Sequence, residues 1–221
     1  MNAVFVALLA GLAGGLYIVG LTLDLFLLKL LAKPWPVLAL AFAVARMTGS
    51  RAARRVALGL VAGAVGDVCL ALPGGFLPGM GAFAVGHALY ITAFLDWNRS
   101  AAGTLLLPVA AFCGVGLVLM LPGAGAMALP LAIYVAVIGT MLWRAAACAL
   151  LPRDDTLARW GFMTGAVLFA VSDFLIGMNR FLQPLAGSAV PIILSYWAGQ
   201  TLIAATAIRC DRLLPPASPK A

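Results

Sequence analysis

Three side chains able to hold or transfer a proton lie inside long apolar runs of this sequence. Asp67 and His87 are the ionisable groups within the two runs of residues 51–90, and Asp173 lies within a later run, 160–178. An ionisable group in hydrocarbon costs at least about 2.5 kcal/mol, so it needs a partner or a task. Two carboxyls in low dielectric tend to share one proton. Such a pair provides the carboxylic acid and the carboxylate that general acid–base hydrolysis requires.

The composition places these groups in a membrane. Of the 221 residues, 64% are hydrophobic and 10% are charged, and the mean hydropathy is +1.10. Each span needs roughly 20 apolar residues, so the chain holds about eight spans and no sizeable soluble domain. We therefore expect an all-α polytopic bundle, with one transmembrane domain over residues 1–210 and a short, disordered cytoplasmic tail over 211–221.

Apolar runs and their breaks at proline, glycine and charged residues define the helices. They predict spans at 3–22, 34–47, 52–72, 78–95, 101–121, 127–149, 156–180 and 188–208. Residues 23–33 form an amphipathic segment that could lie at the membrane interface or extend a neighbouring helix. Pro122-Gly123 is expected to end the fifth span, and Asp155 or Thr156 to cap the seventh.

The net charge of +7 is distributed as a membrane topology signal, and we exclude a nucleic-acid partner. If both termini are cytoplasmic, eleven of the fourteen Lys and Arg lie inside: Arg46, Arg51, Arg54, Arg55, Arg99, Arg144, Arg153, Arg159, Arg209, Arg212 and Lys220. The other side keeps Lys29, Lys33 and Arg180. This asymmetry favours an even number of spans and cytoplasmic termini. We expect a multi-pass protein of a bacterial inner (cytoplasmic) membrane. The four cysteines are single and apolar in context, so neither disulfides nor a thiolate metal site is expected.

A rise of 1.5 Å per residue places Asp67, His87, Asp173 and Tyr196 in one layer, roughly 7 to 14 Å below the non-cytoplasmic surface. Helix periodicity places Tyr90 on the same face as His87, at i, i+3, and Gln200 on the same face as Tyr196, at i, i+4. The predicted catalytic residues are Asp67 and Asp173, and the predicted substrate-binding or orienting residues are Lys33, His87, Tyr90, Ser172, Asn179, Arg180, Tyr196 and Gln200. The basic residues of the sparse face, above the pair, could bind a phosphate or simply snorkel to the interface.

Other roles for the same residues stay open. The aspartates could be polar groups that only fix helix packing, and His87 could be a satisfied core histidine. A proton- or cation-coupled transporter would also need paired membrane carboxylates. An intramembrane aspartic protease is disfavoured because Ala64 stands where its Gly-x-Gly-Asp signature has a glycine. A zinc hydrolase would need more histidines than the one present, and we expect no metal and no cofactor.

The motifs also carry a family resemblance. They are Lys33-Pro34, Gly66-Asp67, Phe83 with Gly86, His87 and Tyr90, Gly165 with Phe169 and Ser172-Asp173, and Tyr196 with Gln200. In this order they resemble the YhhN-like lysoplasmalogenase family over about residues 33–205. The resemblance implies an eight-helix membrane enzyme that hydrolyses the vinyl ether bond of lysoplasmalogens to a fatty aldehyde and glycerophosphoethanolamine or glycerophosphocholine. A lysophospholipid substrate and membrane lipids are then the expected partners, and no protein partner is inferred.

The residue chemistry fits that reaction. Vinyl ether hydrolysis begins with protonation of an alkene carbon, and water then attacks the oxocarbenium ion to give a hemiacetal that collapses. A protonated carboxyl can supply the proton, and an ionised one can stabilise the cation and orient or deprotonate water. The sequence leaves open which aspartate starts protonated.

Overall fold

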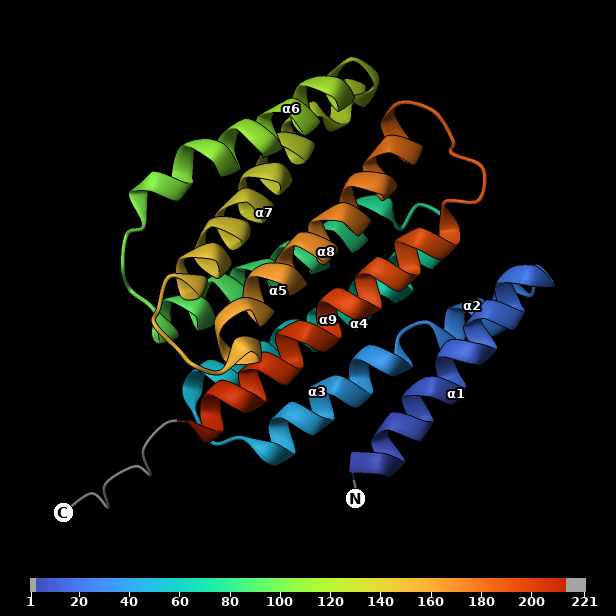
Figure 1. Cartoon of the computed structure of the whole chain (residues 1–221). Helices are drawn as coiled ribbons and strands as arrows, with labels where there is room; N and C mark the ends of the chain where they lie inside the picture. Colours follow the sequence, from blue (N-terminus) through green and yellow to red (C-terminus); the bar gives the residue numbers. More distant parts are fainter. Residues whose placement is uncertain (1–2, 214–221) are drawn as a thin grey trace.

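The structure is a computed structural model that describes residues 3–213. Figure 1 shows a bundle of α-helices, with no strand in this range. The helices are α1 (Ala3–Thr22), α2 (Phe26–Ala32), α3 (Trp35–Met47), α4 (Arg51–Ala71), α5 (Phe76–Trp97), α6 (Leu106–Ala124), α7 (Ala128–Ala149), α8 (Thr156–Phe181) and α9 (Ala189–Arg212). Single 3-10 turns, Gly103–Leu105 and Gly125–Met127, precede α6 and α7. The expected all-α class is confirmed.

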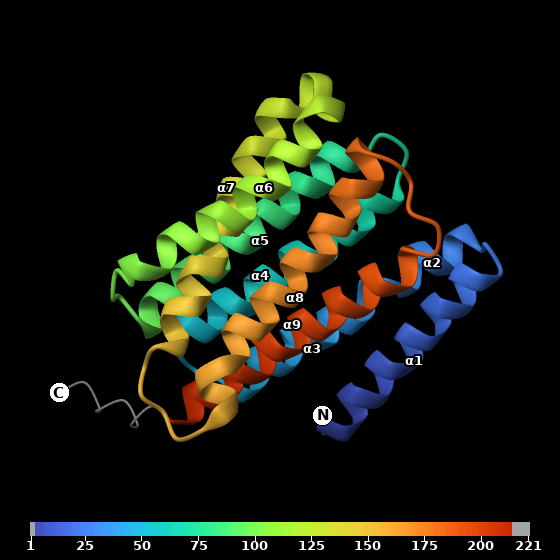
Figure 2. The same ribbon diagram turned by 45° about the horizontal axis from the view of Figure 1, so that its top comes forward.

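The bundle has a central group of four helices, α4, α5, α8 and α9, and two flanking groups. α4 packs most extensively on α5, and α8 on α9. α1, α2 and α3 cover one side and α6 and α7 the other, as Figures 1 and 2 show from two directions. Glycines allow the closest approach, because a Cβ at Gly199 would lie only 2.7 Å from the Gly165 oxygen. The central group carries both aspartates.

Several helices suit a bilayer. Five segments are long and apolar enough to cross a membrane: Phe26–Met47, Phe76–Trp97, Gly103–Ala149, Thr156–Phe181 and Ala189–Arg212. The apolar part of α1, Ala10–Thr22, is shorter, and α4 carries three arginines in its first five residues. Large apolar side chains such as Leu107 and Leu129 lie exposed on the outside, 77% and 71%. The chain is a multi-pass membrane protein.

Of the two alternatives for residues 23–33, the structure agrees with the extension of a neighbouring helix, which here contains a break. Asp24 turns the chain with a φ of 53°, and α2 then runs back toward α3, from which it is separated only by Lys33 and Pro34. Proline has no N–H to donate to the preceding turn, so the helical hydrogen bonds are interrupted there. Together α2 and α3 form the candidate span Phe26–Met47. The second span therefore starts eight residues before the predicted start at Pro34.

Two helix ends also differ from expectation. α6 passes through Pro122 and ends at Ala124, because the backbone reverses at Gly125, whose φ of 51° favours glycine. α9 continues to Arg212, past the predicted boundary at 210, and the rest of the predicted tail, 214–221, lies outside the described residues. The predicted cap of α8 is confirmed, since Asp155 Oδ1 accepts from Ala158 N at 2.7 Å.

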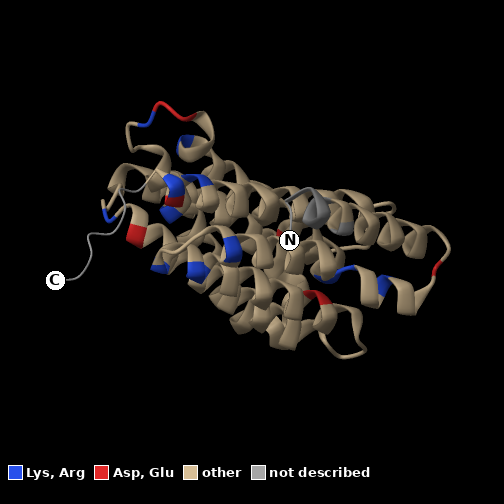
Figure 3. Cartoon of the chain, turned by 90° about the horizontal axis from the view of Figure 1, so that it is seen from below, with Lys and Arg blue, Asp and Glu red and all other residues tan. Residues whose placement is uncertain are grey.

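The charged side chains separate the two ends of the bundle. α1 begins and α9 ends at the same end (Figure 1), and most Lys and Arg gather there (Figure 3). Ion pairs join Arg55 to Asp96 and Arg209 to Asp155, each at 2.6 Å. The opposite end holds the turn at Asp24. We call these the basic end and the opposite end.

Candidate active site

Asp67 is held on α4 by two partners from distant parts of the chain. Its side chain is 1% exposed. Lys33 Nζ lies 3.1 Å from Asp67 Oδ1, and Tyr196 Oη on α9 donates to Oδ2 at 2.8 Å. The expected position of Lys33 above the aspartates differs from the structure, in which its ammonium contacts Asp67 directly. The break between α2 and α3 brings Lys33 into the bundle, where its charge compensates that of Asp67.

Asp173 has a separate set of partners. His87 Nε2 on α5 lies 3.2 Å from Asp173 Oδ2, and Tyr134 Oη on α7 donates to the same oxygen at 3.0 Å. The other ring nitrogen, His87 Nδ1, lies 3.1 Å from the sulfur of Met141. Sequence reasoning paired His87 with Tyr90 and missed Tyr134 and Met141. Each aspartate thus has its own basic partner, Lys33 for Asp67 and His87 for Asp173.

Tyr90 and Gln200 form a second layer behind Asp67. Tyr90 Oη donates to Gln200 Oε1 at 2.7 Å, and both side chains are fully buried. Gln200 Nε2 has no acceptor among the described residues. Gly63 leaves the space for this layer, because a Cβ there would lie 2.9 Å from Gln200 Nε2 and 3.1 Å from Tyr196 Oη. Gly63 therefore gives room both to this layer and to the Tyr196 hydroxyl that binds Asp67.

The remaining predicted residues lie at the edge of the site or outside it. Ser172 is buried and donates to the Ile192 carbonyl at 3.0 Å. Asn179 bonds Ser188 Oγ and the Leu185 N–H, at 2.8 and 2.7 Å. The Asn179 side chain therefore stabilises the loop between α8 and α9 through these hydrogen bonds.

Arg180 and Lys29 lie at the opposite end of the bundle. The guanidinium carbon of Arg180 stands 5.1 Å from the centre of the Phe76 ring, and the Arg180 side chain is exposed. Lys29 pairs with the exposed Asp24 at 2.6 Å. This pairing and the Lys29 charge lower the pKa of the Asp24 carboxyl.

A small cavity joins the two aspartates. Its volume is about 10 Å³, and it is lined by Lys33, Asp67, Phe83, Ser172, Asp173, Ile176, Ile192, Ile193 and Tyr196. A cavity of that size has room for about one water molecule. Both carboxyls therefore line one space that is large enough for a water molecule, the second reactant of a hydrolysis.

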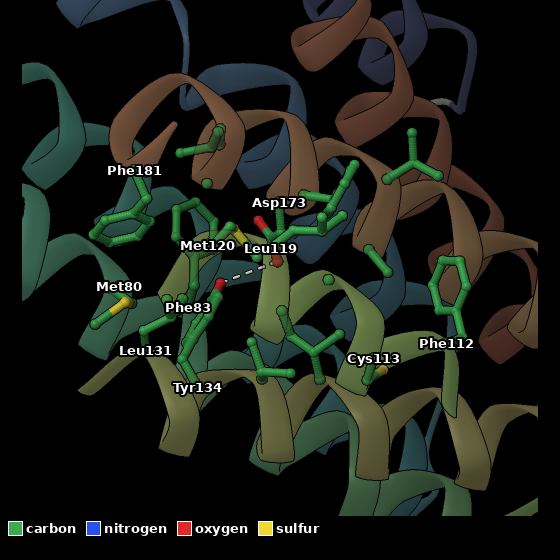
Figure 4. Close-up of a pocket in the computed structure, with 18 of the residues that line it drawn as sticks. Met80, Phe83, Phe112, Cys113, Leu119, Met120, Leu131, Tyr134, Asp173 and Phe181 are labelled. Atoms are coloured by element: carbon green, nitrogen blue, oxygen red, sulfur yellow. Dashed lines mark hydrogen bonds between the residues drawn. The ribbon is translucent and has the colours of Figure 1, made fainter. Parts of the chain in front are cut away.

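A large cavity lies beside it, between α5, α6, α7 and α8. Its volume is about 590 Å³, and Figure 4 shows its mainly apolar lining with the hydrogen bond from Tyr134 to Asp173. Asp173 lines both cavities. Phe112 and Val115 of α6 line the large cavity and are each 63% exposed. The cavity therefore opens through the side of the bundle, where a bilayer would lie.

The arrangement can bind a long apolar molecule with one functional group at the carboxyls. The large cavity has the size and lining of a small-molecule site, and Asp173 and Tyr134 are the polar groups in its wall. Asp67 stands across the small cavity with a lysine beside it. Two carboxyls with different partners on either side of a water-sized space are suited to acid–base chemistry.

Comparisons with known proteins agree with the motifs. The YhhN family profile matches residues 28–207. Human lysoplasmalogenase TMEM86B is 39% identical over 81% of this chain and 75% of its own length, and bovine lysoplasmalogenase TMEM86A is 38% identical over 71% and 66%. A lysoplasmalogenase of Mycobacterium bovis is 34% identical over 89% and 80%. No solved structure matches significantly. The resemblance is confirmed, and the chain belongs to the YhhN family.

Proposed function

We propose that this protein is a lysoplasmalogenase, a vinyl ether hydrolase of the membrane that uses Asp67 and Asp173 as a general acid–base pair. The observation that carries the proposal is that both carboxyls line one water-sized cavity and that Asp173 also lines a large apolar cavity. The curated relatives with 34–39% identity are named lysoplasmalogenases, which supports the same activity.

The substrate fits with its chain in the large cavity. The apolar lining receives the alkenyl chain, and the vinyl ether lies beside Asp173, where the two cavities meet. Asp173 stands eight residues before the end of α8, which is about 12 Å along the helix axis. The glycerol and phosphate then extend toward the opposite end of the bundle. Arg180 is exposed there, beside Phe76 of the large cavity, and is the proposed phosphate ligand.

The reaction needs one proton donor and one activated water. A protonated carboxyl transfers its proton to the alkene carbon, and positive charge develops on the ether-bearing carbon. The second carboxylate stabilises this charge and takes a proton from the water that attacks it. The hemiacetal then collapses to the aldehyde and the glycerol hydroxyl, and the residues present supply each proton transfer without a cofactor.

The proposal includes a membrane topology for the helices that carry this site. We propose that eight of them, all except the short α2 taken alone, cross the bilayer as a single domain, with α2 completing the span of α3. The gathering of Lys and Arg at the basic end supports cytoplasmic termini (Figure 3). The active site then lies nearer the non-cytoplasmic face of the inner membrane of a bacterium, and its lipid partners reach it from the bilayer.

The activity is tested by aldehyde release from a lysoplasmalogen by the full chain purified in detergent. Lysolipids with a saturated ether and with an acyl ester serve as matched substrates. We expect cleavage of the vinyl ether alone, and loss of at least about 10²-fold in both Asp67→Asn and Asp173→Asn.

Thermal unfolding and gel filtration show whether the two variants fold. If the folded wild type cleaves none of the three lipids, the proposed hydrolase activity is refuted. Proton-coupled transport, which can also use a pair of membrane carboxyls, would then be the function to test. Cleavage by a folded Asp67→Asn or Asp173→Asn at the wild-type rate would contradict the roles given to the aspartates.

A further inference from the structure

The two ring nitrogens of His87 have different partners, and this determines where its proton lies. Nδ1 is 3.1 Å from Met141 Sδ. A thioether sulfur has no proton and can only accept, so Nδ1 must carry the hydrogen of this contact. The other nitrogen, Nε2, is then either an acceptor in a neutral ring or a donor in an imidazolium. In both cases Met141 excludes the neutral tautomer with its proton on Nε2.

The charge of the buried site favours the neutral ring. Lys33 and Asp67 compensate one another at 3.1 Å. His87 is fully buried, and the Asp173 side chain is 6% exposed. A neutral His87 beside an ionised Asp173 would leave an unpaired negative charge inside the bundle, so the His87–Asp173 pair holds one further proton. In an apolar surrounding the pair is more stable uncharged than as two separated charges.

We propose that Asp173 is the protonated carboxyl and the general acid, that Met141 and Tyr134 are positioning residues for it, and that Lys33 keeps Asp67 ionised as the base. This inference rests on the proposed function and assigns the roles within it. Asp173 Oδ2 donates to His87 Nε2, and Tyr134 donates to Oδ2. When Asp173 loses its proton, the Tyr134 hydrogen bond stabilises the carboxylate that forms.

The proton transfers balance over one reaction cycle. The alkene π electrons form a bond to the Asp173 proton, and the charge moves to the ether-bearing carbon. Water bonds to that carbon and gives a proton to Asp67. In the collapse of the hemiacetal, Asp67 returns its proton to the leaving glycerol oxygen, and the hemiacetal hydroxyl proton returns to Asp173. Both carboxyls end in their starting states.

His87 makes this testable, because it is the only histidine in the chain. A ¹⁵N spectrum of the full chain labelled at histidine reports one imidazole without further assignment. We expect Nδ1 to be protonated and Nε2 to be an unprotonated acceptor at neutral pH. A neutral ring protonated at Nε2, or an imidazolium, would overturn the assignment of Asp173 as the protonated carboxyl.

Variants at Met141 test the positioning role. Met141→Leu keeps the volume but removes the acceptor, so the Nε2–H tautomer becomes accessible and kcat falls about tenfold with KM unchanged. Met141→Gln offers an amide oxygen to Nδ1–H and should retain the wild-type tautomer and rate. Met163→Leu, a half-buried methionine of α8 that lines neither cavity, is the matched control. Equal kcat and equal spectra for Met141→Leu and the wild type would overturn the role of Met141.

The activity assay tests the proposed function, and the ¹⁵N spectrum tests the roles of the residues independently of it. A wild type that does not cleave lysoplasmalogens would refute the proposed function, whereas the tautomer is read without any substrate. Cleavage together with an Nε2–H ring would retain the function and refute the roles.

Discussion

Lys33 Nζ lies 3.1 Å from Asp67 Oδ1 at the point where the backbone breaks between α2 and α3. The lysine is 16% exposed and the aspartate 1%. Removal of one partner of an ion pair at this depth strongly destabilises the fold, because the other charge is left buried without compensation.

Lys33→Met should therefore lower the free energy of unfolding by about 3 kcal/mol and reduce vinyl ether cleavage by about 10²-fold or more. The double variant Lys33→Met/Asp67→Asn should regain much of the stability without regaining activity, since no buried charge is left. Unfolding in detergent and aldehyde release measure the two effects. Lys29→Met, which breaks the exposed pair with Asp24, is the control and should change neither. Full activity in folded Lys33→Met would refute the role of the lysine.

Gly63 provides the space for the Tyr196 hydroxyl and the Gln200 amide. Gly63→Ala should displace Tyr196 from Asp67 and lower kcat by about 10²-fold, because small displacements of reacting groups are costly. Gly81→Ala on α5 is matched, since a Cβ there meets nothing within 4 Å. It should leave kcat unchanged and stabilise the helix by up to about 1 kcal/mol. Steady-state kinetics of both variants decide between a site effect and a general helix effect.

The large cavity is lined by exposed side chains of α6, Phe112 and Val115, and of α8, Val171 and Phe174, so its side opening lies between these helices. A Cβ at Gly116 would face the Phe174 ring at 3.5 Å, so Gly116→Phe should fill this space and raise KM for long-chain substrates about tenfold. Gly114→Phe places the same side chain on α6 where nothing lies within 4 Å. We expect that control to behave as the wild type across a series of alkenyl chain lengths. Equal KM values for the two variants would show that chains do not use this opening.

Asp155 links the basic end of the bundle to acid stability. The Ala158 N–H and the Arg209 guanidinium bond its carboxylate and lower the pKa of Asp155. A carboxyl with a lowered folded-state pKa stabilises the fold fully above its unfolded pKa of about 3.9, and that contribution is lost as pH falls through the folded value. The Tm of Asp155→Asn should therefore lie below that of the wild type near neutral pH. In strong acid the two Tm values should converge. Parallel Tm curves over the whole range would contradict the linkage.

The all-α class and the approximate positions of most helices could be predicted from the sequence, because apolar runs separated by polar breaks mark where helices lie. The path around Lys33 could not. Pro34 is equally compatible with the first turn of a new helix and with a break inside a longer one. Only packing of α2 against α1 and α4 decides for the break, and this packing brings Lys33 to Asp67.

The site was predicted in part. Depth along the helices selected Asp67, Asp173 and Tyr196, which line the small cavity. It also selected His87, whose Nε2 lies 3.2 Å from Asp173 Oδ2. Tyr134 and Met141 were missed because each is an ordinary residue of an apolar helix. Their spacing of seven residues, which places them on one face of α7, was the available signal. A polar partner on another helix is needed to distinguish such a face from core packing.

The side opening of the large cavity has a consequence for the products. A fatty aldehyde formed beside Asp173 would leave between α6 and α8 into the lipid leaflet, whereas the water-soluble headgroup would leave at the end marked by Arg180. The reactive carbonyl would then never cross water on its way out. Product inhibition should therefore follow the mole fraction of aldehyde in the membrane and not its aqueous concentration.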